Sequence, residues 1–213
     1  MTAQSLIDTL VSDAKPVTRL DAARLLRELI PGFLAAALLV TLIGGLKTDL
    51  STISRDRGLW VLCAILLALT AGSLVLTVRL ARPGARKPRW AWPLIILGAL
   101  AFVVPPIVMM VEDGASPFIH TIEFGGPRCF GLVLMASILP ALLMMRWVRL
   151  GAATQPMLLA GTTALASASL GNFAMLLSCG MSDMRHILMS HGPAMLIVGV
   201  VVAGATLMFT RRW

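Results

Sequence analysis

Three cysteines and three histidines are the side chains best suited to chemistry in this sequence: Cys63, Cys129, Cys179, His120, His186 and His191. Thiolates bind soft metal ions well, and exposed thiols of low pKa are readily oxidised. The cysteines form no Cys-x-x-Cys motif, and the sequence contains neither a His-Glu-x-x-His motif nor a glycine-rich phosphate-binding loop. We therefore expect binding or sensing rather than catalysis, with no catalytic residue, and we predict that the chain is not an enzyme.

The elements that must position these side chains are hydrophobic helices. Of the 213 residues, 58% are apolar and 13% are charged, whereas soluble domains carry about 25% charged residues. Repeated apolar runs of about 20 residues predict membrane spans. The predicted fold is all-α, a six-helix transmembrane bundle with a cytoplasmic N-terminal helical arm. We place the arm at residues 1–29 and the transmembrane domain at 30–213, with spans at about 30–46, 59–78, 91–111, 129–146, 157–178 and 193–210.

The distribution of lysine and arginine predicts the orientation. Thirteen of these residues fall in the arm, the 79–90 and 146–156 segments and the C-terminus, and five fall on the other side. Cytoplasmic loops carry the excess of positive charge, so both termini are predicted to be cytoplasmic. The net charge of +8 then reflects membrane orientation, and we expect contact with the lipid bilayer and no direct contact with nucleic acid.

This orientation places Cys129 and Cys179 on the non-cytoplasmic face, at the start of the fourth span and the end of the fifth. Two interpretations are open. The pair forms a static disulfide that holds the outer loops, or it is a sensor that reacts with oxidant or with a thiol-seeking metal ion. Arg128, Arg185 and His186 stand close enough in sequence to stabilise a thiolate. We expect no resident cofactor, only a heavy-metal ion held transiently at the cysteine pair.

The other candidates receive more ordinary roles. We expect Cys63 to be a small packing residue. The three histidines are expected to be polar loop residues, with His186 and His191 as weaker candidates for metal ligands. In the fifth span, Asn172 is expected to hydrogen-bond a neighbouring helix, and the small residues nearby are expected to allow close helix packing, namely Gly161, Ala164, Ala168 and Gly171.

The arm is the one long polar segment, and its pattern favours a protein partner. Leu6, Ile7, Leu10 and Val11 follow the spacing of one helical face, and Pro16 interrupts the helix. Thr18 with Asp21 is expected to cap a second helix, which carries Leu20, Leu25, Leu26 and Leu29. The arm has four basic and four acidic side chains. A helix designed to lie on anionic lipid would be strongly basic, so an arm resting at the membrane interface is the less favoured alternative.

Two other classes of function remain open at this point. A small membrane transporter or channel would usually bury a charged residue within a span, and no Asp, Glu, Lys or Arg lies in the middle of one. A periplasmic thiol oxidoreductase would usually carry the Cys-x-x-Cys motif that is missing here.

The chain resembles the NrsF family over its whole length. The resemblance rests on Leu6-Ile7-Asp8-x-Leu10 with Pro16-Val17-x-Arg19-Leu20, on Gly125-Gly126-x-x-Cys129, and on Cys179 followed by Asp183 and His191. One departure lies at the second cysteine, where Ser178-Cys179-Gly180 stands in place of a His-Cys-Pro pattern that is common in the family.

The resemblance implies a function. NrsF proteins are six-helix anti-sigma factors of the bacterial inner membrane that restrain an ECF (extracytoplasmic function) sigma factor. It implies that the arm sequesters the sigma factor and that Cys129 and Cys179 sense heavy metals or oxidants. The partner-binding residues would be Leu6, Ile7, Leu10, Val11, Pro16, Val17, Arg19 and Leu20.

Overall fold

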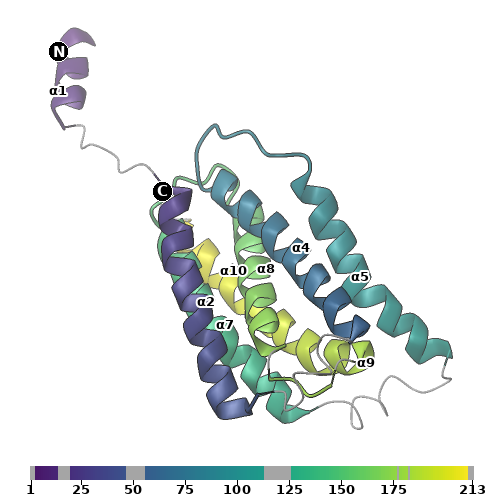
Figure 1. The fold of residues 1–213 in the computed structure, drawn as a ribbon. Coiled ribbons are helices and arrows are strands. Elements are labelled where there is room, and N and C mark those ends of the chain that lie inside the picture. The colour runs from purple at the N-terminus through teal and green to yellow at the C-terminus, as the bar shows by residue number, and fades with distance from the viewer. Residues whose placement is uncertain are drawn as a thin grey trace.

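The computed structural model describes residues 3–13, 20–46, 56–112, 126–176, 178–181 and 183–210. These residues form helices and turns, with no strand among them (Figure 1). The helices, in chain order, are α1 (Ala3–Asp13), α2 (Ala22–Gly44), α4 (Arg57–Leu80), α5 (Ala91–Glu112), α7 (Pro127–Val148), α8 (Pro156–Met175), α9 (Met184–His186), the π-helix η1 (Ile187–His191) and α10 (Gly192–Thr210).

Within the described residues, six helices are long and apolar enough to cross a membrane, as the sequence predicts. They are α2, α4, α5, α7, α8 and the continuous helical segment Met184–Thr210. The last segment begins well before residue 193, where its span was expected to begin. His186 and His191 are therefore helical, and the expectation that they are loop residues is wrong. The boundary expected at residues 29 and 30 falls inside α2, which runs without a break from the arm into the bundle.

Contacts at the two ends of the bundle show that α2 and α7 are antiparallel. At one end, which we call the arm end, the indole N–H of Trp147 donates to Asp21 O at the start of α2, with an N–O distance of 3.2 Å. At the other, which we call the cysteine end, Arg128 at the start of α7 donates to Gly44 O at the end of α2, at 3.1 Å. Figure 1 shows the start of α2 and α9 at opposite ends of the bundle.

Helix α8 is the central helix of the bundle, because it packs against α2, α4, α7 and α10. Of the most apolar stretch of α8, 67% is buried inside the protein, whereas the corresponding value for the other five spans is at most 44%. Its polar side chains find partners inside the protein. Thr162 accepts a hydrogen bond from the Thr77 hydroxyl at 3.0 Å, and Ser169 accepts one from Thr70 at 2.9 Å. A bilayer interior offers no water, so such internal partners are required.

The small residues of α8 do allow close packing, as expected. Ala164 and Ala168 pack against Val198 and Val202 of α10. Gly171 faces α7, where a Cβ atom built on it would lie 2.7 Å from Ser137 Cα. Gly161 has no atom within 4 Å of such a Cβ, so only part of the small-residue face is in tight contact.

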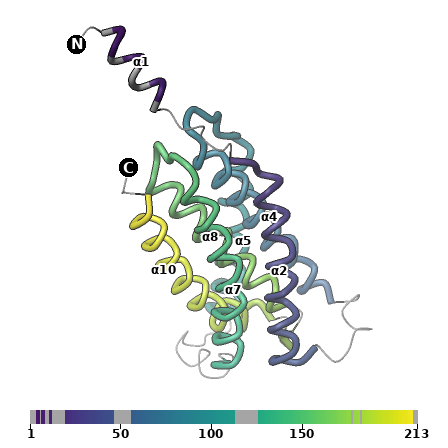
Figure 2. The backbone as a smooth tube through the Cα atoms, turned by 90° about the vertical axis from the view of Figure 1, so that its left-hand side faces the viewer, coloured from purple at the N-terminus to yellow at the C-terminus, as the bar shows by residue number. Residues whose placement is uncertain are grey.

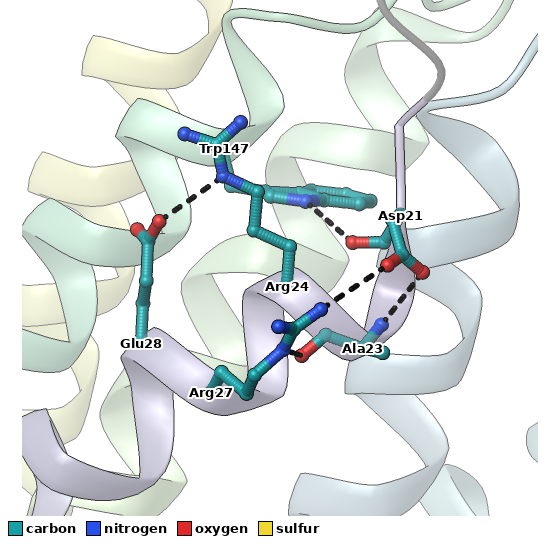
Figure 3. Close-up of polar contacts among 6 residues, drawn as sticks. All are labelled: Asp21, Ala23, Arg24, Arg27, Glu28 and Trp147. Atoms are coloured by element: carbon teal, nitrogen blue, oxygen red, sulfur yellow. Dashed lines mark hydrogen bonds and ion pairs between the residues drawn. The ribbon is translucent and has the colours of Figure 1, made fainter.

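The arm joins the bundle at a capped helix start. The Asp21 carboxylate accepts a hydrogen bond from the Ala23 N–H at 3.0 Å and pairs with Arg27 at 3.7 Å (Figure 3). Asp21 is therefore the N-cap of α2. The helix begins later than expected, because Leu20, which was predicted to lie on it, precedes the cap. Helix α1 lies beyond the arm end of the bundle (Figure 2), and Ile7 and Val11 on it are exposed.

Replacing Gly171 with alanine tests the close contact between α7 and α8. The added methyl group would overlap Ser137, and overpacking of this kind costs about 1–3 kcal/mol of folding free energy. Gly161→Ala is the matched control, because it gains the same helix propensity without a clash. We expect Gly171→Ala to lower the melting temperature in detergent, followed by tryptophan fluorescence, and Gly161→Ala to leave it unchanged or raise it. Equal melting temperatures for the two variants would contradict the packing described here.

Candidate cysteine–histidine site

Four side chains meet at the cysteine end of the bundle. Cys129 lies in the first turn of α7, Cys179 follows α8, His186 ends α9 and His191 ends η1. One ligand atom from each lies within 4.8 Å of the others. We call this set the Cys–His cluster. Cys179, His186 and His191 are buried, and Cys129 is partly exposed. The cluster therefore combines a shielded interior with one accessible thiol.

The π-helix explains why two histidines five residues apart share this site. An α-helical turn takes 3.6 residues, so residues five apart point to different sides of an α-helix. A π-helical turn is wider, with hydrogen bonds between residues five apart. Gly192 N–H donates to Ile187 O in this pattern. The rings of His186 and His191 consequently lie 5.6 Å apart, centroid to centroid, in an edge-on arrangement.

Asn172 of α8 holds His191 in one orientation. His191 Nδ1 and Asn172 Oδ1 lie 2.6 Å apart, and the Asn172 amide donates to Met195 Sδ at 2.9 Å. With the amide nitrogen committed to Met195, Oδ1 accepts the Nδ1 hydrogen of His191, and Nε2 of that ring carries a lone pair. His191 Nε2 is buried and has no hydrogen-bond partner among the described residues. A buried nitrogen lone pair beside two thiols is suited to bind a metal ion or to accept a thiol proton.

His186 is held by hydrogen bonds on both sides of its ring. Its Nε2 lies 3.4 Å from Cys179 Sγ, and its Nδ1 lies 3.4 Å from the Ser190 hydroxyl. Ser190 Oγ also accepts the Gly126 N–H at 3.0 Å, which ties η1 to the start of α7. The sequence offers no histidine directly beside Cys179, but the fold brings His186 to that thiol.

Asp183 begins the helical segment that carries both histidines. Its carboxylate accepts the Arg185 backbone N–H at 2.7 Å and binds the Arg185 guanidinium, with the closest contact at 2.8 Å. The hydrogen bonds from Arg185 lower the pKa of Asp183 below its ordinary value. The N-cap carboxylate therefore stays ionised at neutral pH, and this ion pair fixes the start of the segment.

The arginines near the cysteines do not act as the sequence suggests. Arg128 was expected to stabilise the Cys129 thiolate, but its guanidinium donates to Ile43 O and Gly44 O of α2. Arg185 forms an ion pair with Asp183. The basic groups that do surround the thiols are the two histidines.

The cysteines are free thiols in this structure, so the static disulfide is not formed here. Cys63 packs with apolar residues near the same end of the bundle and lies outside the Cys–His cluster. Cys129 and Cys179 are therefore brought together as the sequence predicts, and Cys63 keeps the packing role expected for it.

The Cys–His cluster fits the coordination preferences of a thiol-seeking divalent ion. A tetrahedral site with ligands at about 2.0–2.3 Å has ligand–ligand separations of about 3.3–3.8 Å. The observed upper limit of 4.8 Å requires the longest separation to shorten by about 1.5 Å at most. Two thiolates and two imidazoles are ligands that zinc and cadmium accept readily.

The predicted partner-binding residues are only partly described. Ile7 and Val11 are exposed on α1. Leu20 instead packs at the arm end, against a buried cluster that contains Ala81 and Trp147. The remaining predicted positions lie outside the described residues, namely Pro16, Val17, Arg19 and the side chains of Leu6 and Leu10; His120 and Gly125 also lie outside them.

Some of the site was not recognised from the sequence. Asn172 was expected to bond a neighbouring helix, which is confirmed, but its link to His191 was not foreseen. Ser190 was not singled out at all. The only available signal was the pair of histidines near a buried cysteine, and their spacing of five matches no ordinary helical face.

The sequence model of the NrsF family, described as "Negative regulator of sigma F", matches residues 10–213. No protein of curated function and no solved structure matches the chain significantly. Because the match covers nearly the whole chain, including all four members of the Cys–His cluster, this protein belongs to the NrsF family of negative regulators of sigma F.

Proposed function

We propose that this protein is a membrane-bound anti-sigma factor with a thiol-based sensor. Its N-terminal arm sequesters an ECF sigma factor and releases it when the Cys–His cluster binds a heavy-metal ion or is oxidised. It lies in the bacterial inner membrane with both termini in the cytoplasm, and it acts without an enzymatic step. The observation that carries the proposal is the meeting of Cys129 and Cys179 at the end of the bundle opposite the arm.

The arm has the properties of a segment that binds a protein partner. Helix α1 leaves Ile7 and Val11 51% and 69% exposed, and it lies beyond the bundle at the arm end (Figure 2). An amphipathic helix that lays its apolar face into a groove is a common mode of peptide recognition. We assign the sigma factor as the occupant of this face because the family regulates a sigma factor.

Metal binding at the Cys–His cluster balances its charges. A divalent ion displaces one proton from each of the Cys129 and Cys179 thiols, and the two thiolates neutralise the ion. His186 and His191 complete four-fold coordination as neutral ligands. Binding at a shielded site is favoured when no net charge remains. A closed cluster would shorten the distances between the start of α7, the segment after α8 and η1.

Oxidation by a peroxide would close the same pair covalently. The partly exposed Cys129 thiol gives its proton to a histidine of the cluster, and the thiolate attacks one peroxide oxygen. The O–O bond breaks and a sulfenic acid forms, while the same proton passes to the leaving hydroxide or alkoxide and gives water, or an alcohol from an organic peroxide. The Cys179 thiol then displaces the hydroxyl as a second water, and the disulfide forms. Two electrons pass from the thiols to the peroxide. Metal binding and oxidation thus draw the same two elements together.

Each chemical event must favour one arm conformation over another to pass a signal. Coupling between two sites is typically worth about 1–3 kcal/mol, equivalent to a change in affinity of about 5- to 150-fold. Release of the sigma factor therefore requires only a modest rearrangement at the arm end.

The first prediction concerns the ligands of the cluster. We expect purified protein in detergent to bind one Cd²⁺ per chain, seen as a thiolate–cadmium absorption band in the ultraviolet. Asn172→Leu removes the support of His191, and loss of such a support typically weakens metal affinity about 10- to 100-fold. Cys63→Ser is the control and should bind normally. If Cys129→Ser and Cys179→Ser both bound Cd²⁺ as tightly as the unmodified protein, the assignment of the cluster would be wrong.

The second prediction concerns sensing in cells. Cys129→Ser and Cys179→Ser should each leave sigma-factor binding intact and abolish induction by cadmium or peroxide, because each removes one half of the reacting pair. Induction is measured with a reporter fused to a target promoter of the sigma factor. Cys63→Ser should respond normally. A normal response from both cluster variants would rule out the pair as the sensor.

The third prediction concerns the arm. Ile7→Asp with Val11→Asp places charges on the exposed apolar face of α1 and should release the sigma factor constitutively. Co-purification with the full-length membrane protein measures binding, and the reporter measures release. Ser5→Asp with Ser12→Asp is the control, because these exposed residues lie on another face of the same helix and the variant adds the same number of charges. Retention of the sigma factor by the double variant would show that this face is not the binding surface.

A further inference from the structure

We propose that α2 carries the state of the Cys–His cluster to the arm, and that Arg128 and Ser178 are the residues that hold α2 to the cluster. The inference rests on the proposed sensor function and concerns how its two ends communicate. Each of these residues stands immediately before a cysteine of the cluster. Both contact the same turn of α2.

Arg128 binds the end of α2 through its guanidinium. Its Nη2 donates to Ile43 O at 3.2 Å and to Gly44 O at 3.1 Å. The last four carbonyls of a helix lack partners within the helix, and a cation there also interacts favourably with the helix dipole. Arg128 thus supplies donors to a helix end that needs them, from the residue adjoining Cys129.

Ser178 contacts the same turn from the side of the second cysteine. The Ser178 hydroxyl lies 3.4 Å from Thr41 Oγ1, and Thr41 O accepts the Gly45 N–H that closes the helix at 2.9 Å. A Cβ atom on Gly44 would lie 3.1 Å from Leu132 Cδ1 and 3.2 Å from Ser178 Cβ. The end of α2 therefore fits closely between α7 and the segment that carries Cys179.

Helix α2 can transmit a displacement because it is continuous and peripheral. It has 23 residues and is about 34 Å long at 1.5 Å per residue. It packs against α7 and α8, through small buried residues that include Gly32, Ala36 and Ala37. Its other side exposes large apolar residues such as Leu34 and Leu42. The packed face also carries the larger buried residues Leu25, Leu29 and Val40. Because the opposite side of α2 is exposed, the helix can shift while the other helices keep their contacts with one another.

The other end of α2 is the point at which the arm joins the bundle, at Asp21. There, Trp147 donates its indole N–H to Asp21 O, and the Asp21 carboxylate caps the helix (Figure 3). Helix α7 therefore contacts both ends of α2, with Arg128 at the cysteine end and Trp147 at the arm end. Closure of the Cys–His cluster moves Cys129 and Cys179 toward each other, and with them Arg128 and Ser178. The turn Thr41–Gly44 then moves relative to Trp147, and the contacts of Asp21 at the start of α2 change.

The test measures Cd²⁺ binding and release of the sigma factor separately. Arg128→Ala combined with Ser178→Ala should bind Cd²⁺ as the unmodified full-length protein does, because neither residue is a ligand. Release of the co-purified sigma factor by Cd²⁺ should nevertheless be lost. Arg128→Lys, which keeps one donor group and the charge, should restore part of the release. Arg57→Ala is the control, an exposed arginine at the cysteine end with no recorded bond to α2 among the described residues, and it should behave normally.

Hydrogen exchange supplies a measurement that needs no sigma factor. In the unmodified protein, Cd²⁺ should change backbone amide exchange in residues 41–46 and again in residues 20–25. In the double variant both changes should disappear while Cd²⁺ is still bound. This result decides the coupling even if the sigma factor is not released by metal, which would be a failure of the proposed function instead.

Three outcomes would overturn the inference. The first is normal sigma-factor release by the double variant with Cd²⁺ bound. The second is the absence of any exchange change in α2 when the unmodified protein binds Cd²⁺. The third is loss of Cd²⁺ binding in the double variant, which would place Arg128 and Ser178 in the construction of the metal site instead of in the link to α2.

Discussion

The requirement that buried polar groups find partners within the protein governs this bundle. Helix α8 is surrounded by four other helices and still carries threonine, serine and asparagine side chains. In a bilayer these groups cannot turn to water. Their hydrogen bonds to α4, η1 and α10 therefore fix the positions of the neighbouring helices. The Asn172–His191 contact is one member of this set, so the same constraint that orders the bundle also orients a member of the Cys–His cluster.

Both cysteines of the cluster lie next to residues that contact α2. The two cysteines lie on different segments, yet the residue before each of them reaches the same helical turn. That turn belongs to the helix from which the arm continues. The Cys–His cluster and the arm therefore lie at opposite ends of the bundle, and α2 extends from one end to the other.

Much of the fold was predictable because membrane spans impose length and composition. The six apolar runs and the pairing of Cys129 with Cys179 follow from hydropathy and topology alone. The roles of His186 and His191 did not follow, because their spacing suits a π-helix, and this geometry leaves little trace in a hydropathy pattern. Arg128 was misjudged for a different reason. Its place beside Cys129 in the chain suggested an electrostatic role, but in three dimensions it reaches an unsatisfied helix end.

The π-helix also allows the sixth span to meet two structural requirements that a regular α-helix could not meet together. A membrane-spanning helix must keep its apolar surface in register with its neighbours along its whole length. A metal or thiol site must bring particular atoms together within an ångström or so. Because the turn at Ile187–His191 is wide, His186 and His191 both face the Cys–His cluster, while the residues of α10 that follow keep their packing against the bundle. Removing a single residue from that turn would leave a span of nearly the same length and hydropathy but would turn the two histidines to different sides of the helix, so the Cys–His cluster can be lost through a change that hydropathy does not register.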